Sequence, residues 1–376
     1  MDDNLAKTSK NYSAIIVSLL FAGSLLTAIL GFESVRSFCF YLSIGIVLYF
    51  FLKDLFVGNV SGVLLFLLLM MACAVLIDFK LNFDYFKRVI IVFCVFISFT
   101  KINYFSKKTT DFEKKEISIL FSILTAIIEL YYYFGGLNKV FFGNTNLISL
   151  NMNNPNEAGM WLTCTFLILV SSIGIWKNVV YKSLLWILSA FLLPIIWATG
   201  SRNCMIACLL FIITFVFIKF FRIKKVNKLI LFLVVVLPAI VFFVYMYIFI
   251  PYLGAFEDSL SGFVSEGKNL TSRSKIWQIV IDNFRNCFLL GDYAKYLDSQ
   301  LHNSLATLYV MFGLPTTILM CFIMYKSLKR FSSEKNVLST TALLCVLLTG
   351  CFEASLFVGV AGLFLVVLIL PCFSQK

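Results

Sequence analysis

The residues best suited to chemistry close one polar stretch of an otherwise apolar chain. His302 is the only histidine among 376 residues, and Asn303 follows it directly before an apolar run. A neutral imidazole near pH 7 suits general-base work, and the neighbouring amide can orient the ring or a substrate hydroxyl. A lone histidine is more often structural than catalytic. Its place, between the polar loop 251–303 and an apolar segment, favours the catalytic interpretation.

Arginines in two further polar stretches are candidates for holding an anion. Arg202 is the single charge in the turn 199–203, which lies between two apolar segments. An arginine at such a boundary often only marks the membrane interface. Arg273 stands where a helix is expected to begin, with Trp277 one turn further on the same face. The positive charge of Arg273 at a helix start opposes the helix dipole, and a bound phosphate would offset this. An interfacial amphipathic helix, with Trp277 facing lipid, is an equally good explanation of the same residues.

Three acidic or polar positions lie near the same predicted surface. The turn Asn154-Pro155-Asn156 precedes an apolar segment and is typical of a helix start with a capping asparagine and a proline. Glu129 and Glu353 lie in or beside apolar segments. Carboxylates in a membrane suggest a function, but the sequence does not place their partners.

The composition is that of a membrane protein. Hydrophobic residues make up 61% of the chain, charged residues make up 13%, and the mean hydropathy is +0.95. A soluble domain is nearer half apolar and a quarter charged. The sequence therefore predicts an all-α, polytopic membrane protein that forms a single integral membrane domain over residues 1–376.

About twelve transmembrane helices are expected, from the length that a helix needs to cross a bilayer. The segments 37–52 and 89–104 have the weakest pattern, because they are short or carry Lys101 at one end. The expected spans are 13–31, 37–52, 60–78, 89–104, 117–134, 157–175, 183–199, 203–221, 229–250, 304–325, 337–352 and 354–373.

Lysine and arginine are distributed unevenly between alternate loops. With the N-terminus in the cytoplasm, the inner loops hold most of these residues, as the positive-inside rule requires. Both termini are then expected in the cytoplasm. The large loop 251–303, with short helices of its own, is expected to face outward, toward the periplasm or the cell exterior, together with 135–156 and 199–203. The cations of loop 79–88 are the one exception.

The same features exclude several other classes of function. The net charge of +12 does not indicate nucleic-acid binding, because the cations lie in short connecting loops. Most of the eleven cysteines lie inside apolar segments, where cysteine behaves as a small hydrophobe. No CxxC pair appears, so neither a disulfide nor a metal site is expected.

Together, the polar stretches resemble the bacterial O-antigen ligase and O-antigen polymerase superfamily of polytopic glycosyltransferases. Each motif alone is weak, whereas their order, spacing and expected outward topology are fairly specific across residues 151–313. The motifs are Asn154-Pro155-Asn156, Thr199-Gly200-Ser201-Arg202, Ser272-Arg273 with Ile276-Trp277, and Leu301-His302-Asn303-Ser304-Leu305 followed by Phe312-Gly313-Leu314.

This resemblance implies an enzyme that joins glycans delivered on undecaprenyl pyrophosphate at the outer face of the bacterial inner membrane. The reaction would be inverting and would need no metal or cofactor, because arginines bind pyrophosphate oxygens in pairs. It implies Arg202 and Arg273 as pyrophosphate ligands and His302 as the group that accepts the acceptor's proton or positions its hydroxyl. The implied substrate-binding residues are Arg285, Asn303, Asn154, Asn156, Trp277 and Tyr293.

Three functions remain open at this point. An O-antigen (surface polysaccharide) polymerase is favoured, because loop 251–303 is modest in length and the Asn-Pro-Asn turn looks more like polymerases. An O-antigen ligase would transfer the glycan to the lipid A core instead. A lipid-linked glycan flippase would carry paired halves and ionisable residues at mid-membrane. The expected partners are undecaprenyl-pyrophosphate-linked glycans, membrane lipid and a chain-length regulator protein, and no nucleic acid.

Overall fold

The secondary structure confirms the expected all-α class. The computed structural model describes residues 12–77, 83–134, 148, 150–152, 154–249, 277–292, 301–332, 336–351 and 362–374, and within these ranges it contains helices and no strand. Several predictions concern residues outside these ranges: Arg273, Tyr293, Glu353, most of loop 251–303, most of loop 135–156 and the first part of the expected span 354–373.

Eight helices in the described ranges are long and apolar enough to cross a membrane. Helices can do so because they satisfy their backbone hydrogen bonds internally. They are α2 (Glu33–Phe56), α4 (Phe83–Lys108), α5 (Asp111–Tyr133), α6 (Pro155–Ser172), α7 (Val179–Ala198), α8 (Arg202–Phe220), α9 (Lys228–Val244, continued by η3, Tyr245–Phe249) and α13 (Ser304–Ser332).

The other apolar helices are shorter. They are α1 (Ser13–Ile29), α3 (Gly62–Ile77), α14 (Val337–Thr349), and a final run of η6 (Leu363–Leu365), α15 (Val366–Ile369) and η7 (Leu370–Phe373). At a rise of about 1.5 Å per residue, α14 extends only about 20 Å, less than the roughly 30 Å of a hydrocarbon core. The membrane-spanning character is therefore supported, while the number of twelve spans stays a prediction.

The two weakest expected spans are longer than the sequence pattern indicated. Segment 37–52 belongs to α2 and segment 89–104 belongs to α4, which extend by one or more turns in both directions. Their charges explain the difference, because Lys101 of α4 forms an ion pair with Asp54 of α2. A charge that has a partner costs less inside a membrane segment, so the apolar helix can extend past it.

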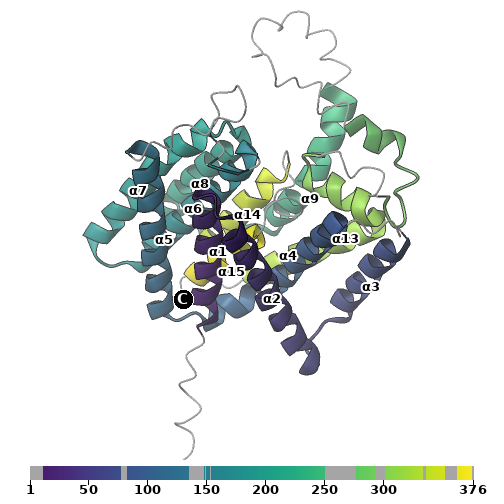
Figure 1. Ribbon diagram of the computed structural model, residues 1–376, viewed down its shortest axis with the longest axis horizontal. Helices are drawn as coiled ribbons and strands as arrows, with labels where there is room; N and C mark the ends of the chain where they lie inside the picture. The colour runs from purple at the N-terminus through teal and green to yellow at the C-terminus, as the bar shows by residue number, and fades with distance from the viewer. Residues whose placement is uncertain are drawn as a thin grey trace, which may run out of the picture.

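The helices form one bundle around a shared apolar core (Figure 1). In this view α5, α6, α7 and α8 lie on one side, α3, α4 and α13 lie on the other, and α1, α14 and α15 lie between them. The most enclosed helix is α6, which is buried along its whole length. Its Trp161 packs on Phe21 of α1 at 4.5 Å between ring centroids, and Phe21 also contacts Phe121 of α5 at 5.6 Å.

One end of the bundle gathers many of the described lysines. Here the buried Lys114 ammonium donates to the Ser374 carbonyl at 2.9 Å, and the Ser106 and Ser374 hydroxyls lie 2.8 Å apart. The ends of α4, α8 and α13 carry further lysines at this same end. We call it the basic end. Its charge favours the cytoplasmic side, although the side of the membrane stays a prediction.

Cysteine labelling can test this orientation. Asn286 and Lys224 are exposed and belong to opposite ends of the bundle. We expect Asn286→Cys to react with an impermeant maleimide in intact spheroplasts, and Lys224→Cys to react only after the membrane is opened. The unmodified chain, with its native cysteines, measures the background. The reverse labelling pattern would place His302 and Arg202 on the cytoplasmic side and remove the basis for a periplasmic site.

Candidate functional site

The segment around His302 is anchored by the side chain of Asn303. The Asn303 amide donates to the carbonyls of Pro238 (2.8 Å) and Cys351 (2.9 Å), and its oxygen accepts the Ala306 N–H at 2.9 Å. Asn303 is fully buried and thereby caps the start of α13. It joins α9, α13 and the end of α14 at one point. These partners give Asn303 a positioning role, and its contact with substrate stays a prediction.

His302 itself adopts a backbone conformation that is uncommon for a non-glycine residue. Its φ is +49°, and its side chain is half-buried. Such positions are enriched at functional sites and turns. The preceding carbonyl, of Leu301, accepts a hydrogen bond from the Trp277 indole N–H at 2.5 Å. Trp277 is buried against Phe242 at 5.1 Å between ring centroids, so it helps to fix the backbone that presents His302.

The His302 segment is recessed into the bundle. Its neighbour Pro238 lies well inside α9, which continues through η3 to Phe249. The helix that follows, α13, is not the single span 304–325 that the sequence predicted. It is interrupted at Gly313, which has a φ of +78°. The correction has a physical basis, because only glycine adopts this conformation readily and an apolar pattern does not reveal it.

A neighbouring backbone segment compensates for the break in α13. The Leu314 N–H donates to the Phe288 carbonyl at 2.9 Å, and the Asp292 N–H donates to the Val310 carbonyl at 2.8 Å. Both groups would otherwise lose helical partners, which is costly in a membrane. A Cβ atom on Gly313 would lie 2.3 Å from the Leu289 carbonyl oxygen. The break therefore locks the segment 288–292 onto the helix that starts beside His302.

Arg202 occupies the first turn of α8 with its side chain exposed. The N-cap residue before it, Ser201, makes no side-chain capping hydrogen bond, and its own N–H donates to the Thr199 hydroxyl at 3.3 Å. Arg202 makes no ion pair or side-chain hydrogen bond with any residue that the structure describes. An unpaired guanidinium at an uncapped helix start suits an anion such as phosphate.

The turn before Arg202 is held against α6. Gly200 has a φ of +65°, and the Thr199 hydroxyl donates to the Ile196 carbonyl at 2.7 Å. Thr199 and Ser201 are buried against Gly159, where an added Cβ would lie 2.7 Å from the Ser201 Cβ. The close approach of α6 thus fixes the orientation in which α8 begins.

The first turns of α6 also connect the Arg202 turn with the His302 segment. Next to Gly159, the Met160 sulfur accepts a hydrogen bond from the Thr349 hydroxyl at 3.2 Å. Thr349 is the last residue of α14, and the carbonyl of Gly350, directly after it, accepts the Ser304 N–H at 2.9 Å. The starts of α8 and α13 therefore lie at one end of the bundle, opposite the basic end. We call this the site end.

The Asn-Pro-Asn turn begins α6 as its pattern predicted. Asn154 is the N-cap, its side chain accepts the Asn156 N–H at 2.9 Å, and Pro155 is the first helical residue. The sequence did not predict the role of the next residue, Glu157, which forms a 2.5 Å ion pair with Arg36 of α2. These partners are 121 residues apart, so no local signal connects them. Substrate contacts of Asn154 and Asn156 stay predictions.

Arg285 and Glu129 differ in their relation to this site. Arg285 is exposed, forms no ion pair or side-chain hydrogen bond within the described ranges, and follows Phe284, which stacks on Tyr309 of α13. It is therefore close to the broken helix. Glu129 lies in α5, which packs on α1, α6 and α7. One of its carboxylate oxygens is buried without a hydrogen-bond partner among the described residues, and the structure does not bring it to His302.

A pair of glycine variants tests the contact that positions Arg202. Gly159→Ala is expected to lower the thermal stability and the activity of the protein, because its new methyl group would overlap Ser201 and Thr199. Overpacking of this kind destabilises by about 1–3 kcal/mol. Gly45→Ala, in α2, is the matched control, since a Cβ there meets nothing within 4 Å. Equal melting temperatures for the two variants would contradict this packing.

Comparisons with protein-family models, with curated proteins and with solved structures find no significant match to this chain. Among the described residues, no group of three or more histidine, cysteine or acidic side chains could hold a metal ion. The arrangement at the site end thus has to be interpreted from its own chemistry. Among the described residues, it offers two exposed guanidinium groups that form no ion pair, those of Arg202 and Arg285, and the imidazole of His302.

Proposed function

We propose that the protein is a glycosyltransferase that joins undecaprenyl-pyrophosphate-linked oligosaccharide repeat units at the periplasmic face of the inner membrane, as an O-antigen polymerase. One observation supports this most directly. Arg202, which makes no ion pair with a described residue, lies at the start of α8, and His302 lies before the start of α13, at the same end of an apolar bundle. An anion site and a base are the two groups that this transfer requires.

The proposed chemistry follows from these two groups. Arg202, with Arg273 and Arg285, holds the donor pyrophosphate, whose negative charge increases as it leaves the anomeric carbon. Guanidinium groups stabilise that charge through paired, charge-assisted hydrogen bonds. The acceptor hydroxyl attacks from the opposite face of the sugar, and His302 accepts its proton. One carbon–oxygen bond breaks, another forms, and the configuration at the anomeric carbon is inverted.

Two residues first expected to bind substrate have structural partners that suit a supporting role. Asn303 ties the start of α13 to α9 and α14, and Trp277 holds the Leu301 carbonyl. A general base must stay within hydrogen-bonding reach of the proton that it accepts. We infer that both side chains serve the reaction by keeping His302 in place.

Reconstitution tests this function and its alternatives. We expect the purified protein, in nanodiscs with lipid-linked repeat units, to lengthen the glycan on undecaprenyl pyrophosphate. The rate should be the same in excess chelator, because arginines take the place of a metal. Transfer only onto a lipid A core would identify a ligase. Movement of the lipid-linked unit across the bilayer without joining would identify a flippase, and activity restored by a divalent ion would contradict the arginine mechanism.

A further inference from the structure

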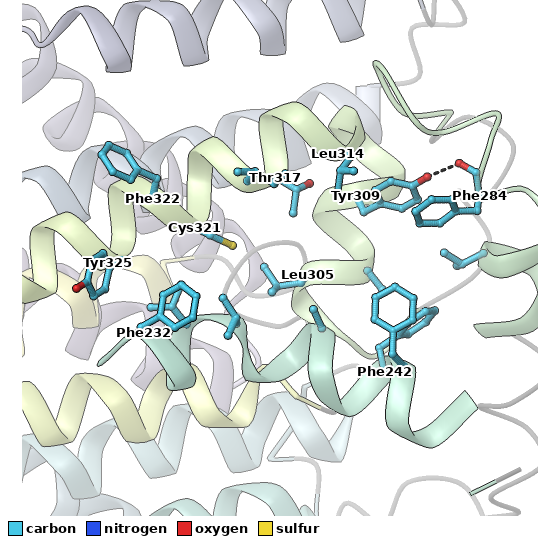
Figure 2. A pocket seen from close by; sticks show the side chains of 17 residues that line it. Phe232, Phe242, Phe284, Leu305, Tyr309, Leu314, Thr317, Cys321, Phe322 and Tyr325 are labelled. Carbon is cyan, nitrogen blue, oxygen red and sulfur yellow. Dashed lines mark hydrogen bonds between the residues drawn. The ribbon is translucent and has the colours of Figure 1, made fainter. Parts of the chain in front are cut away.

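An apolar groove runs between α9 and α13, beside the His302 segment (Figure 2). Its volume is about 540 Å³, and both Val280 and Phe284 line it. Figure 2 shows Phe284 beside Tyr309, at the opposite end of the groove from Phe232 and Tyr325. Its few hydroxyl groups are largely engaged within the protein. The Tyr309 hydroxyl donates to the Phe284 carbonyl, and the Thr317 hydroxyl donates to the Gly313 carbonyl at 2.8 Å. The groove therefore suits hydrocarbon and offers little to a polar headgroup.

The rim of the groove faces the surroundings of the bundle. Four of its large apolar side chains are exposed, Phe232 and Phe243 on α9 and Ile318 and Phe322 on α13. Both helices meet the length and hydropathy of membrane spans. The surroundings are then lipid, so a hydrocarbon chain can enter sideways from the bilayer without crossing water.

The length of the groove limits how much of a hydrocarbon chain it can hold. Its α9 wall runs from Phe232 to Phe243, which at 1.5 Å per residue is about 16 Å. A single methyl-branched hydrocarbon chain fits along such a wall, since carbon atoms pack at about 3.5–4.0 Å.

One end of the groove adjoins the groups assigned to the reaction. Leu305 and Ala306, in the first turn of α13, line it and follow His302 closely in the chain. Phe284, also in its wall, directly precedes the exposed Arg285. A lipid whose hydrocarbon chain lies in the groove would thus present its polar end to His302 and Arg285. This continuity favours the reacting lipid over a bystander phospholipid.

We propose that the groove binds the first isoprene units of the donor's lipid chain and so sets the shortest lipid that the enzyme uses efficiently. An isoprene unit adds four carbon–carbon bonds of about 1.5 Å each, or about 5 Å along an extended chain. The groove therefore accommodates about three units, and units beyond them lie in the bilayer. This inference rests on the proposed function, because it takes the donor to be an isoprenyl pyrophosphate.

Binding of isoprenyl pyrophosphates to the full chain in phospholipid nanodiscs tests the inference. The probes are geranyl, farnesyl, geranylgeranyl and undecaprenyl pyrophosphate, measured by native mass spectrometry and by competition. Affinity should rise about tenfold from geranyl to farnesyl and then stay nearly constant. Ala239→Phe on α9 and Cys321→Phe on α13 fill the groove from opposite walls and should remove that rise. Ile240→Phe, one residue along α9 and outside the lining, is the matched control.

Each outcome of this experiment decides between the alternatives. Affinity that keeps rising beyond geranylgeranyl, or a rise that survives both filling variants, overturns the groove assignment. A phospholipid chain retained in the groove, with binding of the probes independent of their length, overturns it as well. Glycan joining is measured separately on the same preparations. Joining without any effect of the filling variants refutes only the groove, whereas no binding of any pyrophosphate refutes the donor and with it the proposed function.

Discussion

A protein that carries His302→Asn is expected to join glycans about a hundredfold to ten-thousandfold more slowly, which is the contribution of a general base. Asparagine is the most informative replacement because His302 has a φ of +49°. Asparagine adopts the left-handed region with little strain, whereas alanine adds about 1–2 kcal/mol. His302→Asn therefore removes the imidazole and leaves the backbone in place. The measurement is the single-turnover rate of glycan joining by purified protein.

Two further measurements on the same variant separate catalysis from structure. Donor affinity should be nearly unchanged, because the imidazole acts on the acceptor. The melting temperature of His302→Asn should match that of the native protein, while His302→Ala should melt lower. A variant that folds normally and joins glycans within tenfold of the native rate would show that His302 is not the base. The site would then have to be sought around Arg202 alone.

The sequence predicted the helices well because hydrophobic runs are a local property. The expected spans overlap helices wherever the structure describes them, and the Asn154 cap also follows from neighbouring residues. Helix ends were less predictable. Lys101 looked like the end of a span, yet it lies inside α4 and pairs with Asp54, 47 residues away. A hydropathy pattern is read over about twenty neighbouring residues and does not include both partners of this ion pair. The ends of α2 and α4 therefore could not be predicted from it.

The sequence identified candidate site residues by their type, but it did not reveal the structural roles of Trp277 and Asn303. His302 and Arg202 were selected because a histidine and an outward arginine are unusual in such a chain. The partners of Trp277 and Asn303, in contrast, depend on contacts between elements that are distant in the sequence. Trp277 bonds the Leu301 carbonyl 24 residues on, and Asn303 bonds the Pro238 carbonyl 65 residues back. Their positioning roles appear only once the helices are assembled.

The break in α13 and the groove beside it were also outside the reach of the sequence. Gly313 belongs to the sequence motif that follows His302, but the hydropathy of the segment predicted an unbroken helix through this glycine. The break depends on backbone hydrogen bonds supplied by segment 288–292. The groove depends on side chains from α9, α13 and residues 280–284 together. Hydropathy describes how apolar each segment is, but it does not predict that a groove forms between two of them.

Arg202→Lys is expected to reduce glycan joining about tenfold to a hundredfold, the loss expected when hydrogen bonds to a charged group are removed. Lysine keeps the charge but cannot form the paired hydrogen bonds that a guanidinium makes with pyrophosphate. The effect should appear as weaker donor binding and slower turnover together, because the leaving pyrophosphate gains charge in the transition state. Arg273→Lys should behave in the same way, and Arg285→Lys should have a smaller effect.

Arg222→Lys provides the matched control for Arg202→Lys. Arg222 is also exposed and lies two residues beyond Phe220, the last residue of the same helix, α8, at the basic end of the bundle. Both variants should insert into the membrane normally, since lysine and arginine side chains reach the interface equally well. Only Arg202→Lys should shorten the polysaccharide made by cells. Normal chain lengths in strains with Arg202→Lys and with Arg273→Lys would mean that these arginines only mark the interface, and the flippase would become the better interpretation.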